Sequence, residues 1–430
     1  MRSTAAVVLL VLSGCSATSY RSSSCGRATA YGPAPGLRAG VIDDHDRIGD
    51  YVAFVDSMPR GDVPKIDLAD RRILTFVTPD GTPLWDSVVR FEVPGRVVLE
   101  ARTSAKGEAL FAGGALGVRP SERITAYVDG FPADVNPSDD VVVVGNRAQK
   151  DARTIDLDVA LCIDTTSSMD DEVASLRTSL LDVIRRISAT DPGIHLRIGG
   201  VAYRDRGDDY VTKPFDFTSD MASVERTVAT LQTGGGGDHY EAVHEALDAS
   251  LSRLSWRRDG AIRILFLIGD AGPHLERSPD SIEIARRATA QGIQIIPIGC
   301  SGLDDVGELV WRQLAVLTLG KFLFVSYGGT TDHHVGVYEE NDLDELMVRS
   351  IAEAVEAVRH PVRRLPAPPV FTQTYAPIPS PYVGQGQALT PYFPVPPVLV
   401  GQGQAPAPYF APRGPAIGVG RSPVDFGYWR

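Results

Sequence analysis

Apolar runs alternate with amphipathic segments between residues 156 and 360, and this alternation restricts the fold more than any other feature of the chain. The run Leu157–Ile163 and the later stretches "LRIGGVAY", "IRILFLIGD", "IQIIPIGC" and "KFLFVS" have no polar second face. Between them, apolar residues recur at spacings of three and four, as at Val173, Leu176 and Leu180. Strands without a polar face are buried on both faces, so helices must pack against both sides of their sheet. The pattern therefore predicts an α/β fold with a doubly wound, mostly parallel sheet.

The first apolar run ends at an aspartate, and oxygen-bearing side chains follow it. Asp164, Thr166 and Ser168 occupy alternate positions in "DTTSSM", directly before an acidic segment suited to a helix N-terminus. Parallel sheets bind ligands beyond the carboxyl ends of their strands, so we expect these oxygens to meet there. Hard oxygen donors suit Mg²⁺, Mn²⁺ or Ca²⁺ rather than zinc or copper. A helix cap without a metal is the other interpretation of Asp164.

The stretch "DTTSSM" resembles the D-x-[ST]-x-S signature of the metal-ion-dependent adhesion site in von Willebrand factor type A domains. In "GGGGDHYEAV", Asp238 stands where that family usually has a threonine, and "LFLIGDAGPH" resembles the family's strand ending in D-x-x-P. The segment Tyr203–Asp205 resembles the Y-R-D of a subset that includes hemicentin-like proteins and atypical alpha-kinases. The resemblance covers roughly residues 156 to 360. It implies a metal held by Asp164, Thr166, Ser168, Asp238 and Asp270.

In adhesion sites of this family, an Asp or Glu of a protein partner fills an open coordination position, so the resemblance implies metal-dependent protein binding. Three carboxylates at the site would weaken the capture of an acidic group, so binding through neutral oxygens and a purely structural metal both stay open. Arg204, Asp205 and His239 are expected at the rim, with Arg204 and Asp205 paired to brace their loop. A metal-dependent hydrolase is the less favoured alternative, because the sequence shows no nucleophile elbow and no general base beside the cluster.

The N-terminus predicts export and a lipid anchor. Residues 1–14 have one positive charge and an apolar run too short to span a bilayer, as in a signal peptide. "LSGC" resembles the bacterial lipobox, which implies lipidation of Cys15 and placement in the bacterial cell envelope. Ser16 resembles outer-membrane sorting. An ordinary signal peptide with an incidental cysteine is the alternative.

Composition divides the rest of the chain. Residues 15–66 are expected to form a flexible tether, in which the acidic stretch Asp43–Asp50 is interpreted as a solvated loop. Short strands separated by turns predict a β-sandwich at 67–150, which weakly resembles carboxypeptidase regulatory-like modules. The type A domain then occupies 151–360.

Residues 361–430 form a Pro-, Gly- and Gln-rich segment expected to be a disordered tail, in which "VGQGQALTPYF" recurs as "VGQGQAPAPYF". Its proline and aromatic residues suggest an alternative function, an assembly factor that acts through the tail with the type A domain as scaffold.

Charge and cysteines add two limits. The net charge is −12 and the Lys and Arg residues are scattered, so no basic stripe favours a nucleic-acid partner. Cys162 and Cys300 each fall in a strand candidate. Packed thiols are the more common outcome there, but export permits a disulfide and the spacing does not decide between them.

Overall fold

A computed structural model describes residues 37–58, 61, 63–136, 139–145, 153–190, 193–237, 239–326, 331 and 333–365. The expected signal peptide, Cys15 and the tail from residue 366 onwards lie outside the described residues. Within the described part, no helix combines the length and apolar character that crossing a bilayer requires.

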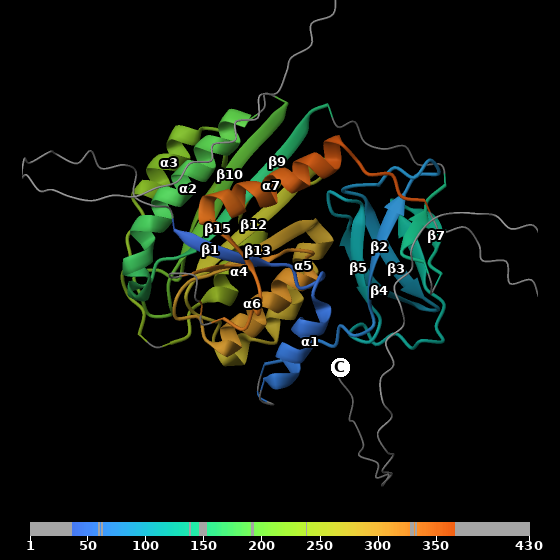
Figure 1. Cartoon of the computed structure of the whole chain (residues 1–430), viewed down its shortest axis with the longest axis horizontal. Coiled ribbons are helices and arrows are strands. Elements are labelled where there is room, and N and C mark those ends of the chain that lie inside the picture. The colour runs from blue at the N-terminus through green and yellow to red at the C-terminus, as the bar shows by residue number, and fades with distance from the viewer. Residues whose placement is uncertain are drawn as a thin grey trace, which may run out of the picture. The chain divides into compact units, whose positions relative to one another are not determined.

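An eight-stranded sheet in the order β11-β10-β9-β12-β13-β14-β1-β15 forms the centre of the fold (Figure 1). The five strands from β10 to β14 in this order run parallel, whereas β11, β1 and β15 pair antiparallel with their neighbours. The predicted mostly parallel α/β sheet is therefore confirmed. The strand bounds are β1 (Arg38–Ile42), β9 (Ile155–Asp164), β10 (Ile194–Tyr203), β11 (Thr212–Thr218), β12 (Ala261–Gly269), β13 (Ile293–Gly299), β14 (Phe322–Val325) and β15 (Glu339–Asp342).

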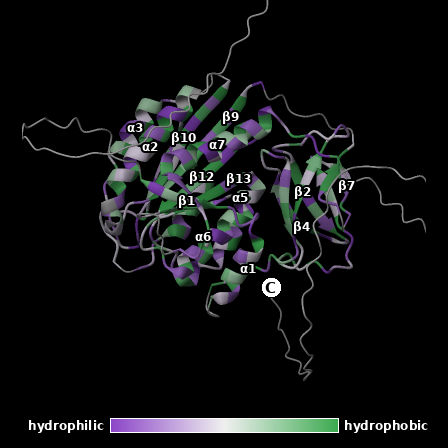
Figure 2. Ribbon diagram, viewed as in Figure 1, coloured by the Kyte–Doolittle hydropathy of each residue, from purple (hydrophilic) through white to green (hydrophobic). Residues whose placement is uncertain are grey.

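Helices cover both faces of this sheet, because successive side chains of a strand point to opposite faces. On β9, Leu157 and Val159 pack with α2, α3 and α7, whereas Ala160 and Cys162 pack with α4, α5 and α6. Figure 2 shows the apolar residues concentrated on the central strands between the two helical layers. The helix bounds are α2 (Asp170–Thr190), α3 (Met221–Ala229), α4 (Val243–Ser252), α5 (Asp280–Gln291), α6 (Asp305–Leu317) and α7 (Leu343–Arg359).

The N-terminal tether is shorter than the sequence predicts. Residues 38–42 form β1, which lies between β14 and β15, and α1 (Ile48–Ser57) follows it. Composition missed this strand because β1 has five residues with a glycine at its centre and depends on partners roughly 300 residues away. Gly40 is required there, since a Cβ at this position would lie 2.3 Å from the Phe324 ring.

The interpretation of Asp43–Asp50 as a solvated loop is wrong at Asp44. Asp44 is buried and accepts two hydrogen bonds from the Arg312 guanidinium, at 2.6 and 2.9 Å. Arg312 lies on α6 and also donates to Glu308. A buried guanidinium needs carboxylate partners, and the acidic loop supplies one of them.

Residues 71–143 form two small sheets, β5-β2-β8 and β4-β3-β6-β7, whose buried apolar side chains make one core. The bounds are β2 (Arg71–Val77), β3 (Val88–Val93), β4 (Arg96–Arg102), β5 (Glu108–Ala112), β6 (Thr125–Val128), β7 (Phe131–Asp134) and β8 (Val141–Val143). The buried Asp86 of this segment accepts a hydrogen bond of 2.8 Å from Arg263 on β12. The β-sandwich is thereby tied to the central sheet.

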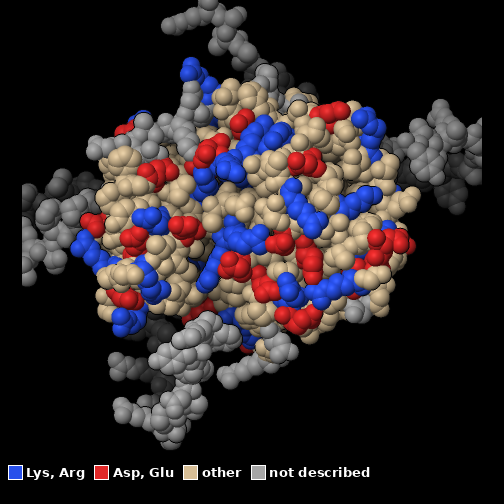
Figure 3. Space-filling view, turned by 180° about the vertical axis from the view of Figure 1, so that it is seen from behind, with Lys and Arg blue, Asp and Glu red and all other residues tan. Residues whose placement is uncertain are grey.

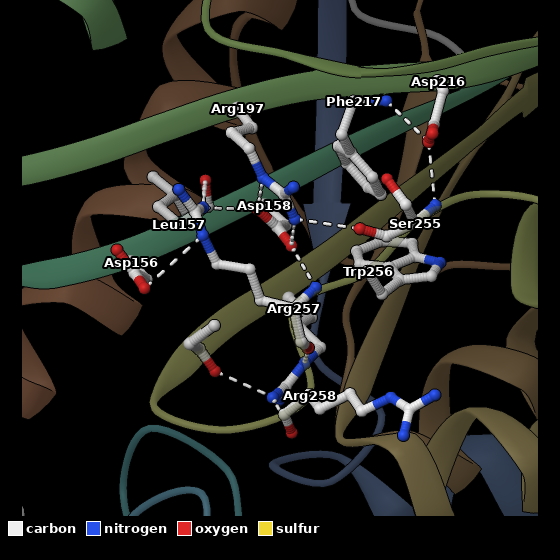
Figure 4. A network of polar contacts seen from close by, with 12 residues as sticks. Asp156, Leu157, Asp158, Arg197, Asp216, Phe217, Ser255, Trp256, Arg257 and Arg258 are labelled. Carbon is white, nitrogen blue, oxygen red and sulfur yellow. Dashed lines mark hydrogen bonds and ion pairs between the residues drawn. The ribbon is translucent and has the colours of Figure 1, made fainter.

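A buried carboxylate also organises the amino ends of the parallel strands (Figure 4). Asp158 on β9 accepts hydrogen bonds from Nε and Nη2 of Arg197 on β10, at 2.9 and 2.7 Å. The Arg257 side chain and its backbone N–H donate two more, at 2.6 and 2.8 Å. All of these contacts lie at the end of the sheet opposite Asp164.

The two cysteines of the sheet are free thiols. Cys162 on β9 and Cys300 after β13 are both buried, and neither forms a disulfide within the described residues. Burial raises the pKa of the Cys162 thiol to about 12. Both residues therefore act as small packing groups.

Candidate metal centre

The turn between β9 and α2 places three oxygen-bearing side chains side by side. Asp164 is the last residue of β9, and its Oδ1 accepts hydrogen bonds from the backbone N–H of Thr166 at 2.9 Å and from its Oγ1 at 2.7 Å. The hydroxyls of Thr166 and Ser168 lie 3.1 Å apart. Asp164 and Thr166 are fully buried, whereas Ser168 is exposed. The cluster therefore reaches from the end of the sheet to the surface.

Asp270 joins this cluster from the neighbouring strand. In the parallel register, Ile268 of β12 lies beside Ile163 of β9, so Gly269 comes to lie against Asp164 and Asp270 follows one residue later. Gly269 makes this approach possible, because a Cβ there would lie 2.9 Å from that of Asp164. Burial raises the pKa of Asp270, and the interaction of its carboxylate with the Ser168 hydroxyl offsets part of that rise.

Glu241 is a further carboxylate of the site, and the sequence interpretation assigned it no role. It lies just before α4, where its backbone N–H donates to the Gly272 carbonyl at 3.1 Å. Its side chain is buried. A Cβ on Gly236 would lie 3.3 Å from both Glu241 Oε1 and Thr166 Cβ, so the carboxylate and the threonine face the same small space. The signal that could have found it is its position three residues after Asp238 in the glycine-rich segment.

The structure thus brings together Asp164, Thr166, Ser168 and Asp270 of the expected ligands, whereas Asp238 lies outside the described residues. Among the residues that are described, no three His, Cys, Asp or Glu side chains converge closely enough to hold an ion by themselves. An ion at this site would therefore take hydroxyl oxygens and water beside the carboxylates.

Residues 158–330 match the family model of the von Willebrand factor type A domain. We call these residues the type A segment. It contains Asp164, Thr166, Ser168, Glu241 and Asp270. The D-x-[ST]-x-S pattern that first suggested the resemblance therefore lies inside the matched region.

Three solved structures of proximal thread matrix protein 1 (PTMP1) from the mussel byssus are similar to this chain. Their sequences are 15–16% identical to it, with TM-scores of 0.30–0.31. The similarity covers 39–40% of this chain and 46–47% of the mussel chains, so about half of their length is spanned. One of these mussel structures has a zinc-occupied MIDAS motif. The comparison with curated proteins found no match.

The three carboxylates of the candidate centre disfavour one another's ionised forms when no cation is bound. Burial, and then the charge of Asp270, raises the pKa of Asp164 to about 7. Burial, and then the charges of Asp164 and Asp205, raises the pKa of Glu241 to about 9. The pKa of Asp270 is also raised, chiefly by burial. A divalent cation would reverse these shifts, because it favours the ionised form of every neighbouring carboxylate.

Three buried oxygen atoms of the site lack a hydrogen-bond donor in the described structure: Asp164 Oδ2, Glu241 Oε2 and Asp270 Oδ1. The Tyr203 hydroxyl lies beside Asp164 but does not reach hydrogen-bond geometry. Buried carboxylate oxygens are normally satisfied by donors or by a metal. The donor set therefore fits a hard divalent ion, with Asp164, Thr166, Ser168 and Asp270 as its holders and Glu241 beside them.

The rim residues are arranged differently from the expectation. Asp205 Oδ1 lies 2.6 Å from His274 Nε2, so its hydrogen-bond partner is the histidine and not Arg204. Arg204 Nη1 instead lies 3.6 Å from an Asp209 oxygen. His239 Nε2 lies 3.1 Å from an Asp304 oxygen, with about half of its side chain exposed. The expected Arg204–Asp205 pair is replaced because His274, which follows β12, reaches the rim from the far side of the loop.

Proposed function

We propose that this chain is a bacterial envelope lipoprotein whose type A segment binds a protein partner through a divalent metal ion. The observation that carries the proposal is the group of donorless carboxylate oxygens next to the paired hydroxyls of Thr166 and Ser168. Carboxylate and hydroxyl oxygens are the donors that Mg²⁺, Mn²⁺ and Ca²⁺ prefer.

The exposed Ser168 indicates where a partner would approach, because the cluster opens to the surface at that residue. The resemblance implies that the partner completes the coordination of the ion with an Asp or Glu. A neutral oxygen is the alternative, since the nearby carboxylates of Asp164, Glu241 and Asp270 already offset part of the charge of the ion. We infer a binding role rather than catalysis, because no described side chain is positioned as a nucleophile beside the cluster.

One face of the molecule carries mixed charge. On the face shown in Figure 3, Lys and Arg side chains alternate with Asp and Glu side chains. Interspersed charges of this kind favour a protein partner over a polyanion, which needs a continuous basic track.

The envelope location rests on the N-terminal residues. Lipidation of Cys15 would tether the type A segment to a membrane, and Ser16 favours the outer one. Mass spectrometry of the membrane-extracted protein tests this directly. A lipid-modified N-terminal cysteine is expected, and Cys15→Ala should release the protein from the membrane fraction.

Thermal unfolding of the full-length protein in detergent tests the metal. Mg²⁺ or Mn²⁺ at about 100 times its Kd should stabilise the native state by about 2.7 kcal/mol and raise Tm. Asp164→Ala should abolish the rise, whereas the control Asp134→Ala changes an exposed aspartate of the sandwich and should keep it. An unchanged Tm in the unsubstituted protein would remove the metal from the proposal.

A further inference from the structure

A hollow of mixed polar and apolar lining lies beside the metal centre, between β10, β11 and α3. It has a volume of about 290 Å³, and its lining includes Arg204, Tyr210, Lys213, Phe215, Leu231 and Gln232. We call it the Arg204 groove. Neither the type A match nor the expected metal ligands assign a role to it.

The groove shares its wall with the metal centre. The Tyr210 hydroxyl lies 2.8 Å from Thr165 Oγ1, and Thr165 directly precedes Thr166 in the turn after β9. The Thr165 carbonyl accepts a hydrogen bond of 3.0 Å from Gly234. A Cβ on Gly234 would in turn lie 3.1 Å from Arg204 Nη2. The turn after β9 therefore connects the metal centre to the wall of the groove.

The groove is cationic, in contrast to the metal centre. The Arg204 guanidinium is buried and stacks on the Tyr210 ring, 4.6 Å from its centroid. The Lys213 Nζ lies 5.8 Å from the same ring, and within the described residues Lys213 forms no ion pair. Asp209 also lines the groove. Its side chain is 92% exposed, and its nearest oxygen lies 3.6 Å from Arg204 Nη1, so solvent screens this ion pair. Two cations thus face one solvated carboxylate.

We propose that the Arg204 groove receives an acidic side chain of the protein partner, next to the metal ion rather than on it. This inference rests on the proposed function and specifies its ligand. At the ion, the carboxylates of Asp164, Glu241 and Asp270, each with an oxygen that lacks a donor, offset the positive charge and weaken its attraction for a further carboxylate. In the groove, Arg204 and Lys213 attract it, while Phe215 and Leu231 contact the aliphatic part of its side chain. The ion is then left to bind a neutral oxygen of the same segment.

Fluorescence anisotropy of a labelled peptide of alternating Glu and Ala tests the groove, with the same peptide carrying Gln as reference. Full-length protein in Mg²⁺ should bind the Glu peptide more tightly than the Gln peptide. Lys213→Gln should weaken binding of the Glu peptide about three- to fivefold, the range for one partly exposed ion pair. Lys213→Arg should restore it. Asp209→Asn should tighten it, because the competing carboxylate is removed.

The control and the metal dependence separate this inference from the proposed function. Lys106→Gln, an exposed lysine of the sandwich, should leave peptide binding unchanged. None of these variants changes a metal donor, so the rise of Tm in Mg²⁺ should persist in all of them. With EDTA the preference for Glu over Gln should remain. If the preference for the Glu peptide disappears with EDTA and is unchanged in Lys213→Gln, the carboxylate binds the ion and the groove proposal is overturned. Equal binding of the Glu and Gln peptides would also overturn it. Loss of the Mg²⁺ effect on Tm alone would overturn the metal and leave the groove standing.

Discussion

Two equally buried aspartates on β9 differ in what surrounds them, and this difference separates a structural residue from a candidate ligand. Asp158 accepts four hydrogen bonds from Arg197 and Arg257, so its charge is fully compensated. Asp164 keeps Oδ2 without a donor and lies next to Asp270. Removing the carboxylate should therefore lower the stability of the protein at Asp158 and raise the stability of the metal-free protein at Asp164.

Asp158→Ala should lower the free energy of unfolding by about 3–5 kcal/mol, because it leaves two arginines facing a buried space without their partner. Urea unfolding measures the change. Asp134→Ala, in an exposed ion pair, should cost less than about 1 kcal/mol. Equal costs for both substitutions would show that the Asp158 network adds nothing to stability.

Asp164→Asn should stabilise the metal-free protein, and increasingly so as the pH rises. The raised pKa of Asp164 means that the folded state holds its proton more strongly than the unfolded state does, so the unsubstituted protein loses stability between about pH 4 and its folded pKa of about 7. The asparagine avoids this loss, on the order of 2–4 kcal/mol at neutral pH. Urea unfolding of both proteins in EDTA, from pH 4 to 8, measures the difference. A difference that does not change with pH would contradict the assignment.

Mg²⁺ at about 100 times its Kd should reduce or remove this advantage of the asparagine variant at neutral pH. The ion stabilises the unsubstituted protein, in which the Asp164 carboxylate is available, and has little effect on the asparagine variant. Urea unfolding of both proteins over the same pH range, with Mg²⁺ in place of EDTA, measures this change.

At the scale of elements, the strand β1 attaches the edge strand β15 to the rest of the sheet. The strand β15 pairs with β1, and β1 pairs in turn with β14. The C-terminal helix α7 begins at Leu343, directly after β15, and packs its apolar face with α2. A strand near the start of the chain thus supports the elements near its end.

Gly40→Ala should test this support. The added Cβ would lie 2.3 Å from the Phe324 ring and 2.7 Å from that of Tyr338, so β1 must shift, at a cost of about 1–3 kcal/mol. Gly49→Ala is the matched control: it lies in α1 with no atom within 4 Å of its added Cβ, and should stabilise by about 0.5–1 kcal/mol. Urea unfolding of the two variants should give changes of opposite sign. A neutral Gly40→Ala would mean that β1 is not needed for stability.

At the scale of the whole molecule, the last described residues return to the sandwich. The Arg364 backbone N–H donates to the Gly81 carbonyl at 2.9 Å, and its guanidinium lies 3.4 Å from Glu108 on β5. The chain from residue 366 onwards can therefore be removed without breaking these contacts.

Truncation after Leu365 separates the two proposed routes to a partner. If the type A segment binds the partner, capture from envelope extract should survive the truncation and be lost in Asp164→Ala and in EDTA. If the tail carries the interaction, the truncation abolishes capture while Asp164→Ala leaves it intact. Pull-down with the full-length protein as reference measures both.

Local sequence was sufficient for the parallel sheet, its helical layers and four residues of the candidate centre, because each is encoded in a periodicity or a contiguous motif. The apolar runs specify strands buried on both faces, and the strand ends bring Asp164 and Asp270 to one edge. Tertiary structure alone decided the strand β1 and the pairing of Asp205 with His274. Each of these depends on contacts between residues far apart in the chain, whose geometry no local pattern encodes. The same holds for the charge contrast between the metal centre and the Arg204 groove, which arises only when the turn after β9 meets β11 and α3.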